Sequence, residues 1–332
     1  MAITRIEIEN FLAFKDKFSA DFCNGINVFI GCNGSGKTTL MKIMYAACKF
    51  SSMKANEYDI KALSNYFDSN EHISDSSING MAQIIFDSPV GKMIENYIKF
   101  VKPNDGIQSE MTNGSKSSAI YIPPEDMLSH SKGFLALANE RKIPFDQTQI
   151  DILSKAAIPE TNKITPNAEK VIDKIKAIIG KNVIYENDTF FVVKETGEKV
   201  SFSFEASGFR KFGLLFKLLR NGLLENGTVL FWDEPENSLN PEILPELINI
   251  LLELQKNGVQ IFIASHSYAV ARWFELNSAK ENTLKYFNMV KSSNGIEYNT
   301  ADTYSQLTKS VLEDADDKLF NAVVKNGMGV KG

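Results

Sequence analysis

Apolar and polar residues follow two different spacings along this chain, and the two spacings predict two kinds of element. Short runs that alternate apolar with polar residues, or that are continuously β-branched and aromatic, are typical of strands. Such runs fall at residues 6–8, 11–22, 26–30, 81–86, 93–101, 119–122, 183–185, 190–193, 200–204, 228–232, 260–264, 284–290 and 296–298. Apolar residues spaced by three and four are typical of helices, and they fall at residues 40–50, within 125–180, and at 207–219, 243–254 and 307–323. The interleaving of the two kinds predicts an α/β fold.

Turn-forming residues place the ends of some of these elements. Pro166 stands at the start of a run with helical spacing and Gly180 at its end, so a helix is expected between them. Residues 103–118 are rich in Gly, Asn, Ser and Lys and predict a mobile loop, whereas residues 51–80 are mixed and give no assignment. The last residues, 327–332, are expected to fray.

Composition narrows the class of protein. The chain has 332 residues, 43% of them hydrophobic, which is ample for a core, and its net charge of −5 gives no overall basic surface for nucleic acid. Segment 161–222 is locally basic, with eleven Lys and Arg against seven Asp and Glu. A solvated surface is the favoured explanation of that segment, and a nucleic-acid patch is the alternative.

Neither the apolar runs nor the cysteines point to a membrane or an oxidising compartment. No apolar run approaches the ~18 residues of a membrane span, and the charged N-terminal residues do not match a signal peptide. Cys23, Cys32 and Cys48 show no disulfide or metal spacing. A reducing, cytoplasmic location is therefore expected.

Residues 31–38 complete the pattern Gly-x-x-x-x-Gly-Lys-Thr between a predicted strand and a predicted helix. Glycines in this position let backbone N–H groups approach phosphate oxygens, and the dipole of the following helix favours negative charge. Lys37 is expected to reach the β- and γ-phosphates, and Thr38 to place a hydroxyl on Mg²⁺. The residues predicted to bind the nucleotide here are Gly31, Asn33, Gly34, Ser35, Gly36, Lys37, Thr38 and Thr39.

Two further polar clusters stand at the ends of predicted buried strands. Asp233 and Glu234 follow the strand at 228–232, where Asp233 is predicted to bind the metal and Glu234 to polarise the attacking water as general base. His266 follows the strand at 260–264, where it can hydrogen-bond the γ-phosphate. Solvated strand ends without a catalytic role are the alternative.

Together these segments resemble the ATP-binding-cassette type of ATPase head. The resemblance rests on residues 31–38, 229–241 and 264–266 and covers nearly the whole chain. Within this type the chain is similar to the RecF, SMC and OLD-family group, and most to compact AAA-type, OLD-like ATPases of bacteria and phage-defence systems. The resemblance implies a P-loop NTPase fold with a mixed β-sheet, an antiparallel β subdomain and an inserted helical lobe.

The resemblance also implies domain boundaries. An N-terminal ATPase lobe with the phosphate loop and antiparallel strands is expected at 1–124, and an inserted helical lobe at 125–182. A C-terminal ATPase lobe is expected at 183–326, followed by a frayed tail at 327–332.

The family's signature motif has one candidate, at Ser207 and Gly208, before an apolar helix. Phe209 and Arg210 depart from the Leu-Ser-Gly-Gly-Gln form, and a simple helix N-cap is the alternative. Glu125 stands where the family has a glutamine after the strand that precedes the helical lobe, so it is a candidate metal neighbour.

The resemblance implies a Mg²⁺-dependent ATPase that forms a head-to-tail homodimer, or a higher homo-oligomer, with ATP between the copies. Neither a sustained heptad run nor a Toprim-type acidic constellation is evident, so a separately encoded nuclease or toxin is the expected effector partner. Two alternatives stay open. One is a RecF-like DNA-repair ATPase that acts directly on nucleic acid, and the other is a nucleotide-gated scaffold with little turnover.

Overall fold

A six-stranded mixed sheet forms the centre of the computed structural model, which describes residues 2–327 except 12, 16, 52–65, 67–79, 88–92, 101–106, 113–117, 141–144, 181, 294 and 309–310. The strand order is β14-β13-β3-β12-β11-β7. Its members are β3 (Ile26–Ile30), β7 (Ala119–Ile122), β11 (Val229–Asp233), β12 (Gln260–Ser265), β13 (Leu284–Ser292) and β14 (Gly295–Ala301). All neighbours pair in parallel except β13 with β14. The α/β fold with a mixed sheet is therefore confirmed.

The four strands β3, β12, β11 and β7, the last of which lies at the edge of the sheet, are buried along their whole length, because both faces of the sheet are covered. On one face lies α1 (Lys37–Ser51), which contacts the central sheet and also β4 and β5 of a second sheet. On the other face lie the helices of residues 134–277, which surround Trp232 and Ile122. Two separate apolar clusters result, one on each side of the sheet.

The second sheet is antiparallel, with the order β2-β1-β4-β5-β6. It consists of β1 (Ala2–Glu9), β2 (Phe18–Asp21), β4 (Gly80–Asp87), β5 (Met93–Phe100) and β6 (Ile107–Thr112). The loop predicted at 103–118 is wrong in its middle, because β6 pairs with β5 there, from Ile107 opposite Phe100 to Thr112 opposite Glu95. The rest of that prediction lies at 103–106 and 113–117, outside the described residues, apart from Ser118.

A group of helices follows β7. They are η1 (Leu128–His130), α3 (Phe134–Glu140), α4 (Gln147–Ala157), α5 (Pro166–Ile179) and, after a small three-stranded sheet, α6 (Ser207–Arg220). The helix predicted between Pro166 and Gly180 is confirmed, and the Thr165 hydroxyl caps it by accepting from the N–H of Ala168. The small sheet contains β8 (Asn182–Glu186), β9 (Thr189–Val193) and β10 (Lys199–Ser201).

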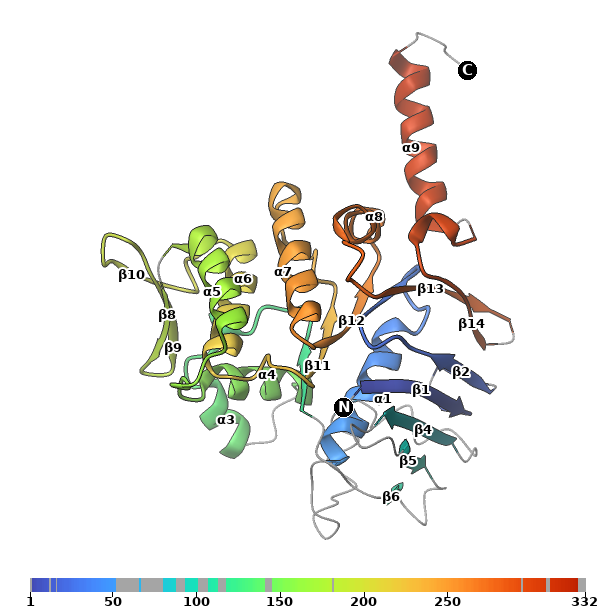
Figure 1. Ribbon diagram of the computed structural model, residues 1–332, viewed down its shortest axis with the longest axis horizontal. Coiled ribbons are helices and arrows are strands. Elements are labelled where there is room, and N and C mark those ends of the chain that lie inside the picture. The colour runs from blue at the N-terminus through green and yellow to red at the C-terminus, as the bar shows by residue number, and fades with distance from the viewer. Residues whose placement is uncertain are drawn as a thin grey trace.

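The C-terminal part adds η2 (Pro241–Ile243), α7 (Leu244–Lys256), α8 (Tyr268–Asn277), η3 (Tyr304–Gln306) and α9 (Val311–Gly327). Figure 1 shows α9, in red, extending away from the rest of the molecule. Its residues Leu319, Phe320 and Val323 are 65%, 68% and 61% exposed. Gly327 still belongs to this helix, and the fraying predicted for 328–332 lies outside the described residues. No described helix combines the length and the apolar character needed to span a membrane.

Candidate nucleotide-binding site

The phosphate loop connects β3 to α1, which begins at Lys37. Gly31, Gly34 and Gly36 have φ angles of 147°, 77° and 86°, values that favour glycine. A Cβ atom on Gly31 would lie 2.2 Å from the carbonyl oxygen of Met289, and one on Gly36 would lie 2.2 Å from Cδ1 of Ile296. The glycine spacing of the loop is therefore required by its own backbone and by the packing of the neighbouring hairpin.

Lys37 lies over the loop that it follows. Its side-chain ammonium group donates to the carbonyl oxygens of Gly31 at 2.8 Å and Cys32 at 3.0 Å. Burial lowers the pKa of Lys37, while the negative charges of Asp233 and Glu234 act in the opposite direction. The ammonium group thus lies within electrostatic reach of the two predicted acidic residues.

Asp233 ends β11 beside the phosphate loop and is only 2% exposed. Its carboxylate accepts hydrogen bonds from the hydroxyl of Thr38 and, at Oδ2, from the hydroxyl of Tyr121 at 3.1 Å. Burial raises the pKa of Asp233 to about 6, and the two hydroxyl donors lower it. The structure therefore brings Thr38 and Asp233 together, as the sequence predicts.

The donors around Asp233 suit Mg²⁺ better than a metal held by protein alone. Among the residues that the structure describes, no three His, Cys, Asp or Glu side chains gather into a metal cage. Mg²⁺ in nucleotide sites typically takes one or two protein oxygens and completes its shell with phosphate oxygens and water. A buried carboxylate beside the hydroxyl of Thr38 fits that pattern.

Glu234 and His266 meet at the ends of β11 and β12. Oε1 of Glu234 lies 3.1 Å from Nδ1 of His266, and both side chains are partly exposed. Glu234 has a φ of 48°, which is rare for a residue other than glycine. Because β11 and β12 are parallel neighbours, their carboxyl ends lie at the same edge of the sheet as the phosphate loop.

Glu236 supports this edge of the site, although the sequence pattern gave it no role. Its Oε1 accepts from the hydroxyl of Ser265 at 2.6 Å and from the N–H of His266 at 3.3 Å. Oε2 of the same carboxylate is buried and has no protein partner. Glu236 therefore fixes the turn that carries His266, and only its place two residues after Glu234 could have indicated it.

The predicted signature residues open α6. Ala206 is the N-cap of this helix and makes no side-chain cap bond, so the alternative that Ser207 is the N-cap is wrong. The exposed hydroxyl of Ser207 donates to the carbonyl oxygen of Ser238 at 3.0 Å. A Cβ atom on Gly208 would lie 3.2 Å from Cδ1 of Leu239. Ser207 and Gly208 thus contact the loop after Glu236 in their own chain.

Two basic residues on α6 bond to two other segments of the chain. Nζ of Lys211 donates to the carbonyl oxygens of Glu234 at 3.2 Å and Pro235 at 2.9 Å, and burial lowers the pKa of Lys211 to about 8. Arg210 forms an ion pair with Asp126 at 2.7 Å. The sequence identified neither interaction, because both join segments far apart in the chain.

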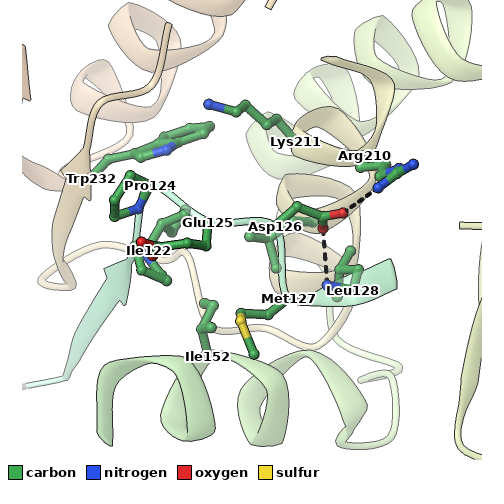
Figure 2. A pocket seen from close by; sticks show the side chains of 12 residues that line it. Ile122, Pro124, Glu125, Asp126, Met127, Leu128, Ile152, Arg210, Lys211 and Trp232 are labelled. Carbon is green, nitrogen blue, oxygen red and sulfur yellow. Dashed lines mark hydrogen bonds and ion pairs between the residues drawn. The ribbon is translucent and has the colours of Figure 1, made fainter. Parts of the chain in front are cut away.

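A small pocket lies where these segments meet. Figure 2 shows Lys211 and Arg210 from α6 on one side, Trp232 and Pro124 on the other, and Glu125 between them. Nε1 of Trp232 is buried without a protein partner. Glu125 is exposed and accepts from Nε2 of Gln149 at 3.4 Å, so its described partner belongs to α4. A role of Glu125 beside the metal stays a prediction.

The comparisons with known proteins agree with this geometry. The family described as "AAA domain, putative AbiEii toxin, Type IV TA system" matches residues 26–272, and the chain belongs to it. The matched region contains the phosphate loop, Asp233 at the end of β11, Glu234 directly after it, and His266. No curated protein matches the chain significantly.

Solved structures of SMC heads share the fold. The SMC head domain from Thermotoga maritima is 14% identical, with a TM-score of 0.52, over 91% of this chain and 100% of that one. An Smc head bound to the C-terminal winged-helix domain of ScpA is 12% identical, with a TM-score of 0.59, over 92% and 99% of the two chains. An Smc head from Pyrococcus furiosus, bound to the C-terminal domain of ScpA, is 11% identical, with a TM-score of 0.57, over 97% and 99%. The chain therefore has the fold of an ATP-binding-cassette-type ATPase head.

Proposed function

We propose that this protein binds ATP with Mg²⁺ on the phosphate loop and hydrolyses it. The observation that carries the proposal is the meeting of Asp233, Glu234 and His266 at the sheet edge that holds Lys37 and Thr38. Asp233 and Thr38 would hold the ion, which when bound would offset negative charge on the phosphates. The family match supports nucleotide binding in general terms.

Each residue of the loop edge then has a role in hydrolysis. Backbone N–H groups of the loop and the N-terminus of α1 bind phosphate oxygens, and Lys37 adds a positive charge. Glu234 accepts a proton from the water that attacks the γ-phosphate. His266, 3.1 Å from Glu234, holds that carboxylate in place and faces the terminal phosphate. The order of β3, β12 and β11 in the sheet, which brings their carboxyl ends to one edge, supports this assignment.

Replacing the general base tests the assignment. Glu234→Gln keeps the size of the side chain but cannot accept the proton, so phosphate release should fall by about 10²–10⁴-fold while ATP binding is retained. Lys37→Ala should lose ATP binding itself. Glu246→Gln, on the exposed face of α7, is the matched control and should behave as wild type. Wild-type turnover by Glu234→Gln would rule out this role.

A second copy of the chain completes the proposed site. Ser207 is exposed at the first turn of α6, and Phe204, three residues before it, is 86% exposed. A helix N-terminus is suited to bind an anion, so we propose that Ser207 and Gly208 of one copy meet the γ-phosphate held by the other. The result is a head-to-tail homodimer with two bound ATP molecules.

The Glu234→Gln variant should bind ATP without hydrolysing it, so the ATP-bound dimer can be measured. Glu234→Gln with ATP and Mg²⁺ should double in mass by light scattering, whereas the same protein with EDTA should stay monomeric. A monomer under both conditions, with ATP bound, would refute the dimer but not nucleotide binding. An ATP-dependent assembly larger than a dimer would support contact between heads but refute the proposed number of two copies.

We further propose that the ATP state regulates a separately encoded nuclease or toxin, in the reducing cytoplasm that three free cysteines favour. The family description includes a toxin–antitoxin system, and two of the similar heads are solved with a bound protein domain. Effector activity should differ between co-expressed wild type and Lys37→Ala. Equal activity would argue against regulation by the ATP state. A difference in effector activity together with very slow ATP turnover would favour the alternative, a nucleotide-gated scaffold.

Direct action on DNA is less well supported by the surface. Seven of the eleven basic residues in 161–222 form ion pairs within the chain, which leaves less positive charge for a phosphate backbone. Salt-dependent DNA binding by the ATP-bound protein would restore the RecF-like alternative.

A further inference from the structure

Tyr121 is joined to the proposed magnesium ligand by a buried hydrogen bond. Its hydroxyl donates to Oδ2 of Asp233 at 3.1 Å, across 112 residues of sequence. Tyr121 is 1% exposed and Asp233 is 2% exposed, so water does not compete for either group. A buried hydroxyl that lost this partner would carry the full cost of its desolvation.

The register of the central sheet explains why the two side chains meet. β7 and β11 run in parallel, with Tyr121 opposite Phe231. Side chains alternate between the faces of a strand, so Asp233, two residues after Phe231, points to the same face as Tyr121. That face is the one covered by α1.

Packing holds the tyrosine ring independently of the hydrogen bond. The ring of Tyr121 lies 5.5 Å from the ring of Tyr45 on α1 and is stacked on Phe231 at 6.3 Å. The hydroxyl is therefore presented to Asp233 from a fixed position. A terminal carboxylate torsion is soft, so a fixed donor on one oxygen selects one orientation.

We propose that Tyr121 is a positioning residue for the metal: its hydroxyl fixes Oδ2 of Asp233, so that the carboxylate meets Mg²⁺ in a single orientation. The inference rests on the proposed Mg²⁺–ATP site and adds a residue that contacts neither nucleotide nor ion. Donors that orient metal ligands typically change metal affinity 10–100-fold when they are removed.

Tyr121→Phe removes the hydroxyl oxygen and leaves the ring. The Mg²⁺ concentration that half-saturates the stabilising effect of ATP on thermal unfolding should rise about tenfold, because the carboxylate is no longer held. Binding of a fluorescent ATP analogue in EDTA should be unchanged. Tyr45→Phe is the matched control, since its hydroxyl donates to Asp151 at 2.7 Å in the same aromatic cluster. Its Mg²⁺ midpoint should equal that of wild type.

A double variant separates positioning from general damage to the core. In an Asp233→Asn background, adding Tyr121→Phe should shift the midpoint no further, because the oriented carboxylate is already absent. A wild-type midpoint in Tyr121→Phe, or an equal shift in Tyr45→Phe, would overturn the inference. If Mg²⁺ had no effect on ATP binding by the wild-type protein, the proposed metal site itself would be refuted. The failure of the inference and the failure of the metal site are therefore distinguishable.

Discussion

Asp233 illustrates how a single site residue opposes stability. Its carboxylate is almost fully buried, and burial raises its pKa to about 6, above the usual 3.8. A pKa that is higher in the folded state means that the folded chain binds the proton more tightly than the unfolded chain. The tighter proton binding by Asp233 contributes fully to the free energy of unfolding below pH ~4, and this contribution is lost as the pH rises through 6. At neutral pH the charged Asp233 therefore lowers the free energy of unfolding.

Asp233→Asn should stabilise the ligand-free protein. At pH 8 in EDTA we expect the free energy of unfolding to rise by about 1–3 kcal/mol, and the gain to fall to about half by pH 5. Urea unfolding at the two pH values measures both quantities. Asp173→Asn, on the exposed surface of α5, is the control and should change little. If the free energy of unfolding did not rise at pH 8, or rose equally at the two pH values, the raised pKa of Asp233 would be contradicted.

The residues of the site differ in how far sequence could predict them. Lys37 and Thr38 belong to one contiguous pattern, and Asp233 and Glu234 directly follow a recognisable buried strand. Tyr121 and Lys211 act through hydrogen bonds to residues 112 and 23–24 positions away, and no local pattern encodes such pairs. Such long-range partners become visible only when the register of the sheet and the packing of α6 are known.

Among the elements, α1 and α4 are joined by a buried polar network. Asp151 on α4 accepts from the hydroxyl of Tyr45 at 2.7 Å and of Tyr66 at 3.1 Å, and forms an ion pair with Lys49 on α1 at 3.2 Å. Because α1 begins at the phosphate loop, this network connects the loop to the helical part of the chain.

Asp151→Ala should be strongly destabilising. It removes a buried carboxylate that accepts from two tyrosine hydroxyls and pairs with a lysine, so the free energy of unfolding should fall by about 2–4 kcal/mol. Thermal or urea unfolding of the ligand-free protein measures the loss. Ser154→Ala, on the exposed face of the same helix, should stay within about 0.5 kcal/mol of wild type. A loss as small as that of Ser154→Ala would show that the network is not energetically coupled.

Elements with strong local patterns could be predicted, and those formed by packing could not. The strands at 26–30 and 119–122 have the predicted bounds, because they are short runs of mostly apolar residues. β6 has a mixed sequence and is a strand because it pairs with β5. α8 was missed because only Val270, Ala271 and Phe274 are buried in it, too few to define a period. The helix predicted at 307–323 is wrong at its start, because Leu307 is the extended residue that ends η3 and α9 begins at Val311. Leu319 and Val323 of its predicted apolar face are exposed.

At the scale of the whole molecule, α6 connects two sites that belong to different copies in the proposed dimer. Its first turn carries Ser207, which would face the second copy in that dimer, while Lys211, one turn later, donates to the backbone carbonyl oxygen of Glu234 in its own copy. In the proposed dimer, ATP bound by one copy would therefore be linked through α6 to Glu234, the proposed general base, of the other copy. The exposed aromatic ring of Phe204 lies just before this turn, where a second copy would cover it.

Phe204→Ser should weaken the ATP-dependent dimer without affecting the monomer. A buried aromatic anchor is worth about 2 kcal/mol or more at an interface, so the dissociation constant of the Glu234→Gln dimer should rise at least about tenfold. The ATP affinity of the dilute monomer should be unchanged, because Phe204 lies beside the turn that meets the ATP of the other copy and not beside the phosphate loop of its own copy. Leu276→Ser is the matched control, since Leu276 is 64% exposed on α8, away from the signature turn. Sedimentation velocity over a concentration series measures both variants, and equal dimer affinity in Phe204→Ser and its parent would show that the second copy does not cover this ring.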